Sequence, residues 1–100
     1  MNDSLLLGNA DCRVRVDAAR GGRIASLCVY GEELLVAAGD DPLARGSYPL
    51  APWAGRLREG RFRFGGREYR MPCDSGAHAI HGTVFRRGWQ IVAGDTLRIE

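Results

Sequence analysis

The chain has 100 residues, enough for one small domain with a modest hydrophobic core. Its hydrophobic fraction of 45% is typical of a globular protein and argues against a disordered one. No window approaches the roughly 18 apolar residues of a membrane span, and the first residues lack the basic and apolar regions of a secretory signal. We therefore expect a cytoplasmic protein with no membrane partner.

The net charge is only +2, and all 14 basic residues are arginine. Six of these arginines lie between Arg56 and Arg70, interspersed with Glu59 and Glu68. Such a cluster can neutralise nucleic-acid phosphates, but it also fits the solvated face of alternating strands. The low net charge favours the solvated face, so we expect no nucleic-acid partner.

The three cysteines, Cys12, Cys28 and Cys73, are odd in number and widely spaced. No C-x-x-C pair is present, which argues against a disulfide framework or a zinc knuckle. Buried, reduced thiols are the better interpretation.

The first half of the chain predicts antiparallel strands joined by tight turns. Residues 12–16 alternate apolar and charged side chains, the period of a half-buried strand. Residues 21–31 and 33–38 follow as two further strands, separated by a glycine. A polar break at 39–49 leads into a loop rich in proline and aromatic residues.

Residues 61–64 and 67–71, joined by a Gly-Gly turn, predict a β-hairpin. Phe62 and Phe64 are expected to share one face of this hairpin, and Arg61 and Arg63 the other.

After a loop at 72–83, residues 88–92 and 96–100 predict a last pair of strands around a Gly-Asp turn. No segment shows sustained helical periodicity, so the sequence predicts an all-β, antiparallel, sandwich-like fold. The final strand runs into Glu100 without a closing turn. Because an unpaired sheet edge is normally protected, we expect the chain to be one incomplete domain, residues 1–100, of a larger sheet.

Residues 49–56 form the first candidate site, with prolines that stiffen the backbone around Trp53 and Arg56. An aromatic face and a planar fork of donors suit the C–H faces and hydroxyls of a sugar. A packed loop with a core tryptophan and a surface arginine fits the same residues.

Residues 78–82 form the second candidate, with His78 and His81 three residues apart. Two such histidines can share a metal on a helix, but the flanking glycines favour loop and strand, and no third ligand stands nearby. We therefore expect no metal, and in the absence of a nucleotide motif we expect no cofactor. A histidine beside glycine can instead contact a ligand, or bond within the fold.

Together these segments resemble the N-terminal part of the aldose 1-epimerase (galactose mutarotase) family. The resemblance rests on G-G-R-I-A-S-L and G-E-E-L-L at 21–27 and 31–35, on the long stretch from P-L-A-P-W-A-G-R to G-G-R-E-Y at 49–69, and on H-A-I-H-G-T-V-F followed by G-W at 78–89. It implies a β-supersandwich, of which this chain is about the first third. It also implies that the partner is a hexose whose α and β anomers are interconverted.

In that family a carboxylate takes the proton from the anomeric hydroxyl while an imidazole protonates the ring oxygen. By resemblance Arg56 is the sugar-binding arginine, His81 is a substrate-contacting histidine, and Trp53 lines the same pocket. The family's acid and base are expected beyond Glu100, so no catalytic residue is assigned within the chain, and neither Glu68 nor Asp74 takes the role of the base.

Two positions depart from the family pattern. Gly55 and His78 stand where many members have asparagine, so two amides that read sugar hydroxyls are missing. Some relatives act on hexose 6-phosphates, and Arg86 with Arg87 fits an anionic sugar. A non-catalytic carbohydrate-binding module remains the alternative function. The sequence leaves the oligomeric state and the preferred hexose open.

Overall fold

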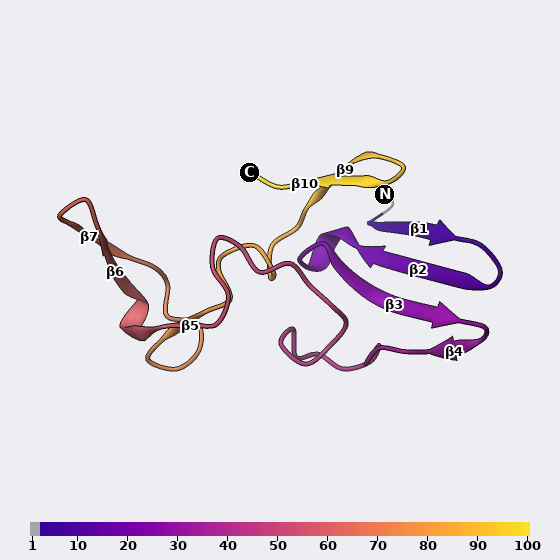
Figure 1. Ribbon diagram of the computed structural model, residues 1–100, viewed down its shortest axis with the longest axis horizontal. Helices are drawn as coiled ribbons and strands as arrows, with labels where there is room; N and C mark the ends of the chain where they lie inside the picture. The colour runs from indigo at the N-terminus through magenta and orange to yellow at the C-terminus, as the bar shows by residue number, and fades with distance from the viewer. Residues whose placement is uncertain (1–2) are drawn as a thin grey trace. The chain divides into compact units, whose positions relative to one another are not determined.

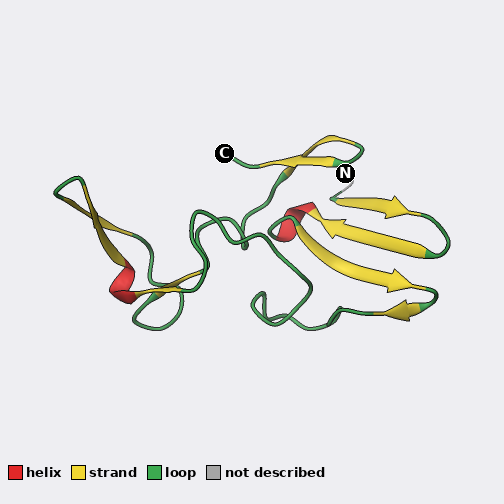
Figure 2. Ribbon diagram, in the orientation of Figure 1, coloured by secondary structure: helices red, strands yellow, loops and turns green. Residues whose placement is uncertain are grey.

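The computed structural model describes residues 3–100. They form ten β-strands and two 3-10 turns, η1 (Ala18–Arg20) and η2 (Arg58–Gly60), connected by loops (Figures 1 and 2). Every pairing between these strands is antiparallel. The prediction of an all-β, antiparallel fold is therefore confirmed. Neither turn, at three residues each, is long or apolar enough to cross a bilayer, and residues 3–100 contain no other helix.

The chain divides into two compact units. Residues 3–49 together with Val84–Glu100 form the first, and Leu50–Thr83 form the second. The expectation that both belong to one domain stays a prediction.

A four-stranded sheet dominates the first unit. Its strands are β1 (Ser4–Gly8), β2 (Cys12–Asp17), β3 (Arg23–Val29) and β4 (Glu32–Glu33), paired in that order. Two strands expected from the sequence, at 12–16 and 21–31, are confirmed as β2 and β3. The sequence pattern missed β1, because its three consecutive leucines lack the alternation of a half-buried strand.

The strand predicted at 33–38 is wrong, since β4 ends at Glu33. The Glu33 carboxylate accepts hydrogen bonds from the backbone N–H of Leu27 (2.9 Å) and of Leu35 (3.2 Å). The Leu34 N–H still donates to the Leu27 carbonyl (2.9 Å), but the Leu27 N–H, which a longer ladder would pair with Leu34, is occupied by the Glu33 side chain, and the strand stops.

The core of the first unit is small. Leu5, Ala18 and Ala25 are buried with Phe85, whose ring stacks on Tyr48 at a centroid distance of 5.3 Å. With so few buried side chains, backbone hydrogen bonds hold much of this unit in place.

The chain re-enters the first unit at Val84 and packs against η1. Gly21 donates its N–H to the Arg87 carbonyl (2.8 Å), and Trp89 donates to the Ala18 carbonyl (2.7 Å). The strands predicted at 88–92 and 96–100 follow as β9 (Gln90–Ala93) and β10 (Thr96–Arg98), which pair across a register shift. The final hairpin is therefore confirmed, with shorter strands than expected.

All three cysteines are free, but none of them is buried as predicted. Cys12 and Cys73 are exposed, and Cys28 is half-buried. Cys12 opens β2 directly after a turn in which its N–H donates to the Asn9 side chain (3.0 Å). Cys73 follows the exposed hairpin in a loop, so neither position reaches a core.

The second unit contains the hairpin of β6 (Arg61–Phe64) and β7 (Arg67–Arg70), as predicted. Every residue of both strands is exposed, and Phe62 stacks on Tyr69 at 5.2 Å.

Two arginines of the hairpin, Arg61 and Arg70, lie 3.8–4.0 Å from Glu59 or Glu68. Exposed pairs of this kind contribute little to stability, and they fit the solvated face expected for the arginine cluster.

A second pair of strands, β5 (Arg56–Leu57) and β8 (Ala79–Ile80), joins the two ends of the second unit. The sequence analysis placed both segments in loops. Strands of two residues show no periodicity, so only the long-range pairing reveals them.

Candidate functional site

Two stretches of the second unit, residues 51–57 and 79–83, run side by side and contain all three predicted site residues. β5 pairs with β8 so that Arg56 lies opposite Ile80. The next step of the ladder joins Gly55 and His81, whose N–H donates to the Gly55 carbonyl (2.9 Å). Beyond it, Ala51 forms a parallel bridge to Gly82.

A closed loop carries Trp53 at this place. Ala51 and Gly55 are four positions apart, yet their partners, Gly82 and His81, are consecutive. The three residues 52–54 therefore leave the paired backbone as a short loop that is fixed at both ends. Trp53 is the middle residue of that loop.

Gly82 is required for the close approach at the base of this loop. Its φ is 77°, and a Cβ added there would lie 1.8 Å from the Ala51 carbonyl oxygen. No other residue type fits this position without moving the backbone. The close contact with Ala51 therefore explains why a glycine follows His81 in the candidate site.

The imidazole of His81 is anchored to the same loop. Its Nδ1 accepts a hydrogen bond from the N–H of Gly55 at 3.0 Å. Because Nδ1 is the acceptor, a neutral ring carries its proton on Nε2 and acts there as a donor. His81 and Gly55 both have a left-handed backbone conformation, with φ of 57° and 83°. The regular alternation of side chains along the two strands is therefore interrupted at this pair.

Trp53 is half-buried, and its indole Nε1 is shielded from solvent. That N–H finds no acceptor among residues 3–100. The accessible atoms of Trp53 are therefore atoms other than Nε1. Such a side chain can contact a ligand through its apolar ring, but not through its N–H.

Arg56 is exposed at the start of β5. The ladder fixes its backbone beside Ile80, one residue from His81. The structure thus places Arg56 and His81 on one short stretch of paired backbone, and Trp53 in the loop that this stretch closes.

The carboxylates of the second unit have other partners. Asp74 accepts a hydrogen bond from the Ile80 N–H (3.0 Å), while Glu59 and Glu68 lie beside Arg61. His78 accepts from the Glu59 N–H at Nδ1 (2.9 Å). Within residues 3–100, no three His, Cys, Asp or Glu side chains gather as metal ligands do.

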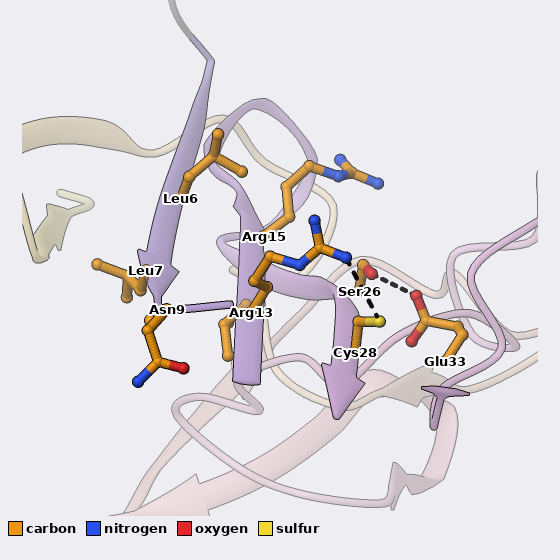
Figure 3. A pocket seen from close by; sticks show the side chains of 10 residues that line it. Leu6, Leu7, Asn9, Arg13, Arg15, Ser26, Cys28 and Glu33 are labelled. Carbon is orange, nitrogen blue, oxygen red and sulfur yellow. Dashed lines mark hydrogen bonds between the residues drawn. The ribbon is translucent and has the colours of Figure 1, made fainter. Parts of the chain in front are cut away.

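The first unit holds a groove of about 530 Å³ that the sequence analysis did not anticipate (Figure 3). It lies on one face of the four-stranded sheet and includes Arg13, Arg15, Ser26 and Glu33. Arg13 and Arg15 are two positions apart on β2, and Ser26 pairs with Arg15 from β3. This period of two is the sequence signal that places their side chains on one face.

Glu33 is a poor candidate for a general base in this groove. Its carboxylate accepts hydrogen bonds from the Ser26 hydroxyl and the Leu27 N–H. These bonds lower the pKa of Glu33 below its usual value, which makes the carboxylate a weaker base.

Comparison with known proteins adds an independent finding. The family profile described as "Aldose 1-epimerase" matches residues 3–98. The protein named "Uncharacterized protein YihR" of Escherichia coli K12 is 36% identical over 75 residues, which are 71% of this chain and 24% of YihR.

A solved structure agrees with the profile. A "putative aldose 1-epimerase" from Escherichia coli K12 aligns with a TM-score of 0.75 and 26% identity, over 94% of this chain and 34% of that protein. The chain therefore spans about a quarter to a third of the length of the relatives that it matches.

Proposed function

The chain belongs to the aldose 1-epimerase family, and we propose that it supplies the sugar-binding groups of an enzyme that interconverts the α and β anomers of a hexose. The observation that carries this proposal is the hydrogen-bonded pair of His81 and Gly55 beside Arg56. It fixes the His81 ring and the backbone that carries Arg56 on one short ladder, an arrangement suited to reading hydroxyl groups.

Each of the three residues has a separate part in this proposal. Arg56 donates to sugar hydroxyls from an exposed position whose backbone is fixed. His81 donates from Nε2, since Nδ1 is engaged by Gly55. Trp53 offers its ring to the C–H face of the sugar.

The chemistry of anomer exchange requires two proton transfers. A base removes the anomeric hydroxyl proton while an acid protonates the ring oxygen, so that the C1–O5 bond breaks and an open-chain aldehyde forms. Rotation of the aldehyde and the reverse steps give the other anomer. By the resemblance to the family, we place this acid and base in the part of the fold that this chain does not cover, since it spans 34% of the solved relative.

The test combines binding with catalysis. Purified chain is titrated with galactose and with glucose by calorimetry, and the mutarotation of α-glucose is followed by polarimetry. We expect binding of at least one sugar without acceleration above buffer.

Two outcomes count against the proposal. Failure to bind either sugar would overturn the role of the three residues. Acceleration that disappears in His81→Ala would place the proton transfer inside the chain and contradict our placement of the acid and base.

A carbohydrate-binding module predicts the same binding. The two functions differ in the longer protein to which we assign this chain: an epimerase accelerates mutarotation, whereas a module binds the sugar and leaves the rate unchanged. Polarimetry on that protein therefore decides between the two functions.

A further inference from the structure

A second groove in the first unit is lined by four arginines, Arg20, Arg23, Arg45 and Arg86. Its volume is about 410 Å³, and the one acidic residue along it is Asp40. Four arginines and one acidic residue along the same groove leave an excess of positive charge. Like charges repel at this range, so their concentration in one groove calls for a physical reason.

Arg23 is the centre of this arrangement. Only 1% of it is exposed, and its guanidinium donates to the carbonyls of Arg20 (2.7 Å), Pro42 (2.9 Å), Arg45 (2.8 Å) and Phe85 (3.1 Å). These bonds tie together three segments that are distant in the sequence. A buried arginine with this many backbone partners fixes its surroundings rigidly.

The three segments that Arg23 fixes each supply one of the other arginines. Arg20 and Arg45 are themselves held by their carbonyls, and Arg86 directly follows Phe85. Arg86 also lies over the Phe85 ring, 4.4 Å from its centroid. The groove is therefore a constructed cluster of arginines, since one buried group positions the backbone of the others.

Donors in the cluster remain unused. The four bonds of Arg23 occupy four of its five N–H groups. The Nε of Arg45 is shielded from solvent and meets no acceptor among residues 3–100. In the same range, neither Arg20 nor Arg45 has an acidic side chain within ion-pair distance.

The burial and the crowding of positive charge disfavour the charged form of Arg23. Burial lowers the pKa of Arg23 from its usual value, and the charge of Arg45 lowers it further. A bound anion would offset both effects, because it adds negative charge and acceptors at the same place.

We propose that the groove of Arg20, Arg23, Arg45 and Arg86 binds an oxyanion of the phosphate class, either inorganic phosphate or the phosphate group of a monoester. A tetrahedral dianion presents several acceptor oxygens to guanidinium forks from different directions, which a single carboxylate such as Asp40 does not. None of the four arginines belongs to the set of Trp53, Arg56 and His81. The inference therefore stands independently of the proposed function.

The test is a calorimetric titration of the chain with inorganic phosphate at low ionic strength. Two variants, Arg20→Ala and Arg45→Ala, remove one guanidinium each from the groove. Arg20 is exposed, so its truncation leaves the fold intact even where loss of Arg45 disturbs it. The control, Arg63→Ala, removes the same charge from the exposed strand β6.

We expect each groove variant to weaken phosphate binding by about tenfold or more, and Arg63→Ala by less than about twofold. A parallel titration with glucose 6-phosphate separates the two sources of the oxyanion. Equal affinity assigns the groove to the free ion, and tighter binding of the ester assigns it to a monoester. Absence of binding to both probes, or equal weakening by all three variants, would overturn the proposal.

Discussion

His81 and Gly55 are joined by two hydrogen bonds of opposite direction. The N–H of His81 donates to the Gly55 carbonyl (2.9 Å), and the N–H of Gly55 donates to Nδ1 of the His81 ring (3.0 Å). The ladder and the imidazole are thus fixed by the same partner. This pair sets both the position of the ring and its tautomer.

Two substitutions at His81 separate its structural part from its part in binding. His81→Asn retains an acceptor for the Gly55 N–H and suits the left-handed backbone, so we expect a loss in the free energy of unfolding below about 1 kcal/mol. His81→Ala leaves that N–H without its acceptor and strains the backbone, at a cost of about 1–3 kcal/mol. Urea denaturation measures both, and equal losses would contradict the anchoring role of the ring.

Gly82 is expected to be intolerant of any side chain. In Gly82→Ala the new Cβ meets the Ala51 carbonyl oxygen at 1.8 Å, so the ladder must open, with a loss of about 3 kcal/mol or more.

Gly76→Ala is the matched control for Gly82→Ala. Gly76 has a similar φ of 64° but no atom within 4 Å of an added Cβ, so we expect a loss of only about 1 kcal/mol. Chemical denaturation of both variants checks the comparison, and equal losses would show that the close approach at Gly82 is unimportant.

Gly55→Asn restores the amide that many members of the family carry before the arginine. Gly55 has a φ of 83° and open space around its Cβ position, and asparagine tolerates left-handed backbone better than other residues. We expect stability to change by less than about 1 kcal/mol and hexose affinity to rise by about threefold or more. Calorimetric titration with galactose gives the answer. An unchanged affinity would show that the added amide does not reach the sugar.

The pH dependence of stability should include a contribution from Glu33. Its pKa is lowered in the folded chain by hydrogen bonds from Ser26 and Leu27, so this contribution is present above the ordinary value of 4.5 and lost as the pH falls through the lower folded value. At neutral pH Glu33→Gln should be less stable than the original chain, and the difference should disappear in acid. Thermal unfolding between neutral and acidic pH measures it, and a difference that grows in acid would contradict the assignment.

Local signals were enough to predict part of the fold. The hairpin of β6 and β7 was predictable because a Gly-Gly turn separates two runs of alternating residues. The strands β2 and β3 show the same alternation. By contrast, β5 and β8 consist of two residues each and exist only through a pairing between positions more than twenty residues apart. No local pattern encodes such a contact.

Side-chain competition for backbone donors explains the wrong strand at 33–38. The residues favour a strand by composition, but the Glu33 carboxylate accepts from the Leu27 N–H, the donor that the next pair of a longer ladder would use. For the candidate site, sequence reasoning selected Trp53, Arg56 and His81, while the bond between His81 and Gly55 required the structure. The arginine groove was missed, since its members are spread from Arg20 to Arg86 and only the buried Arg23 brings them together.

The most direct test of the sugar site is galactose titration of the isotope-labelled chain, followed through the NMR amide signals of Gly55 and His81. Two variants that remove the same charge are compared, Arg56→Ala in β5 and Arg58→Ala in the neighbouring turn η2. We predict that both signals shift on binding, that Arg56→Ala weakens the affinity by about tenfold or more, and that Arg58→Ala changes it by less than about twofold. Signals that do not respond to galactose, or equal effects of the two variants, would contradict the account.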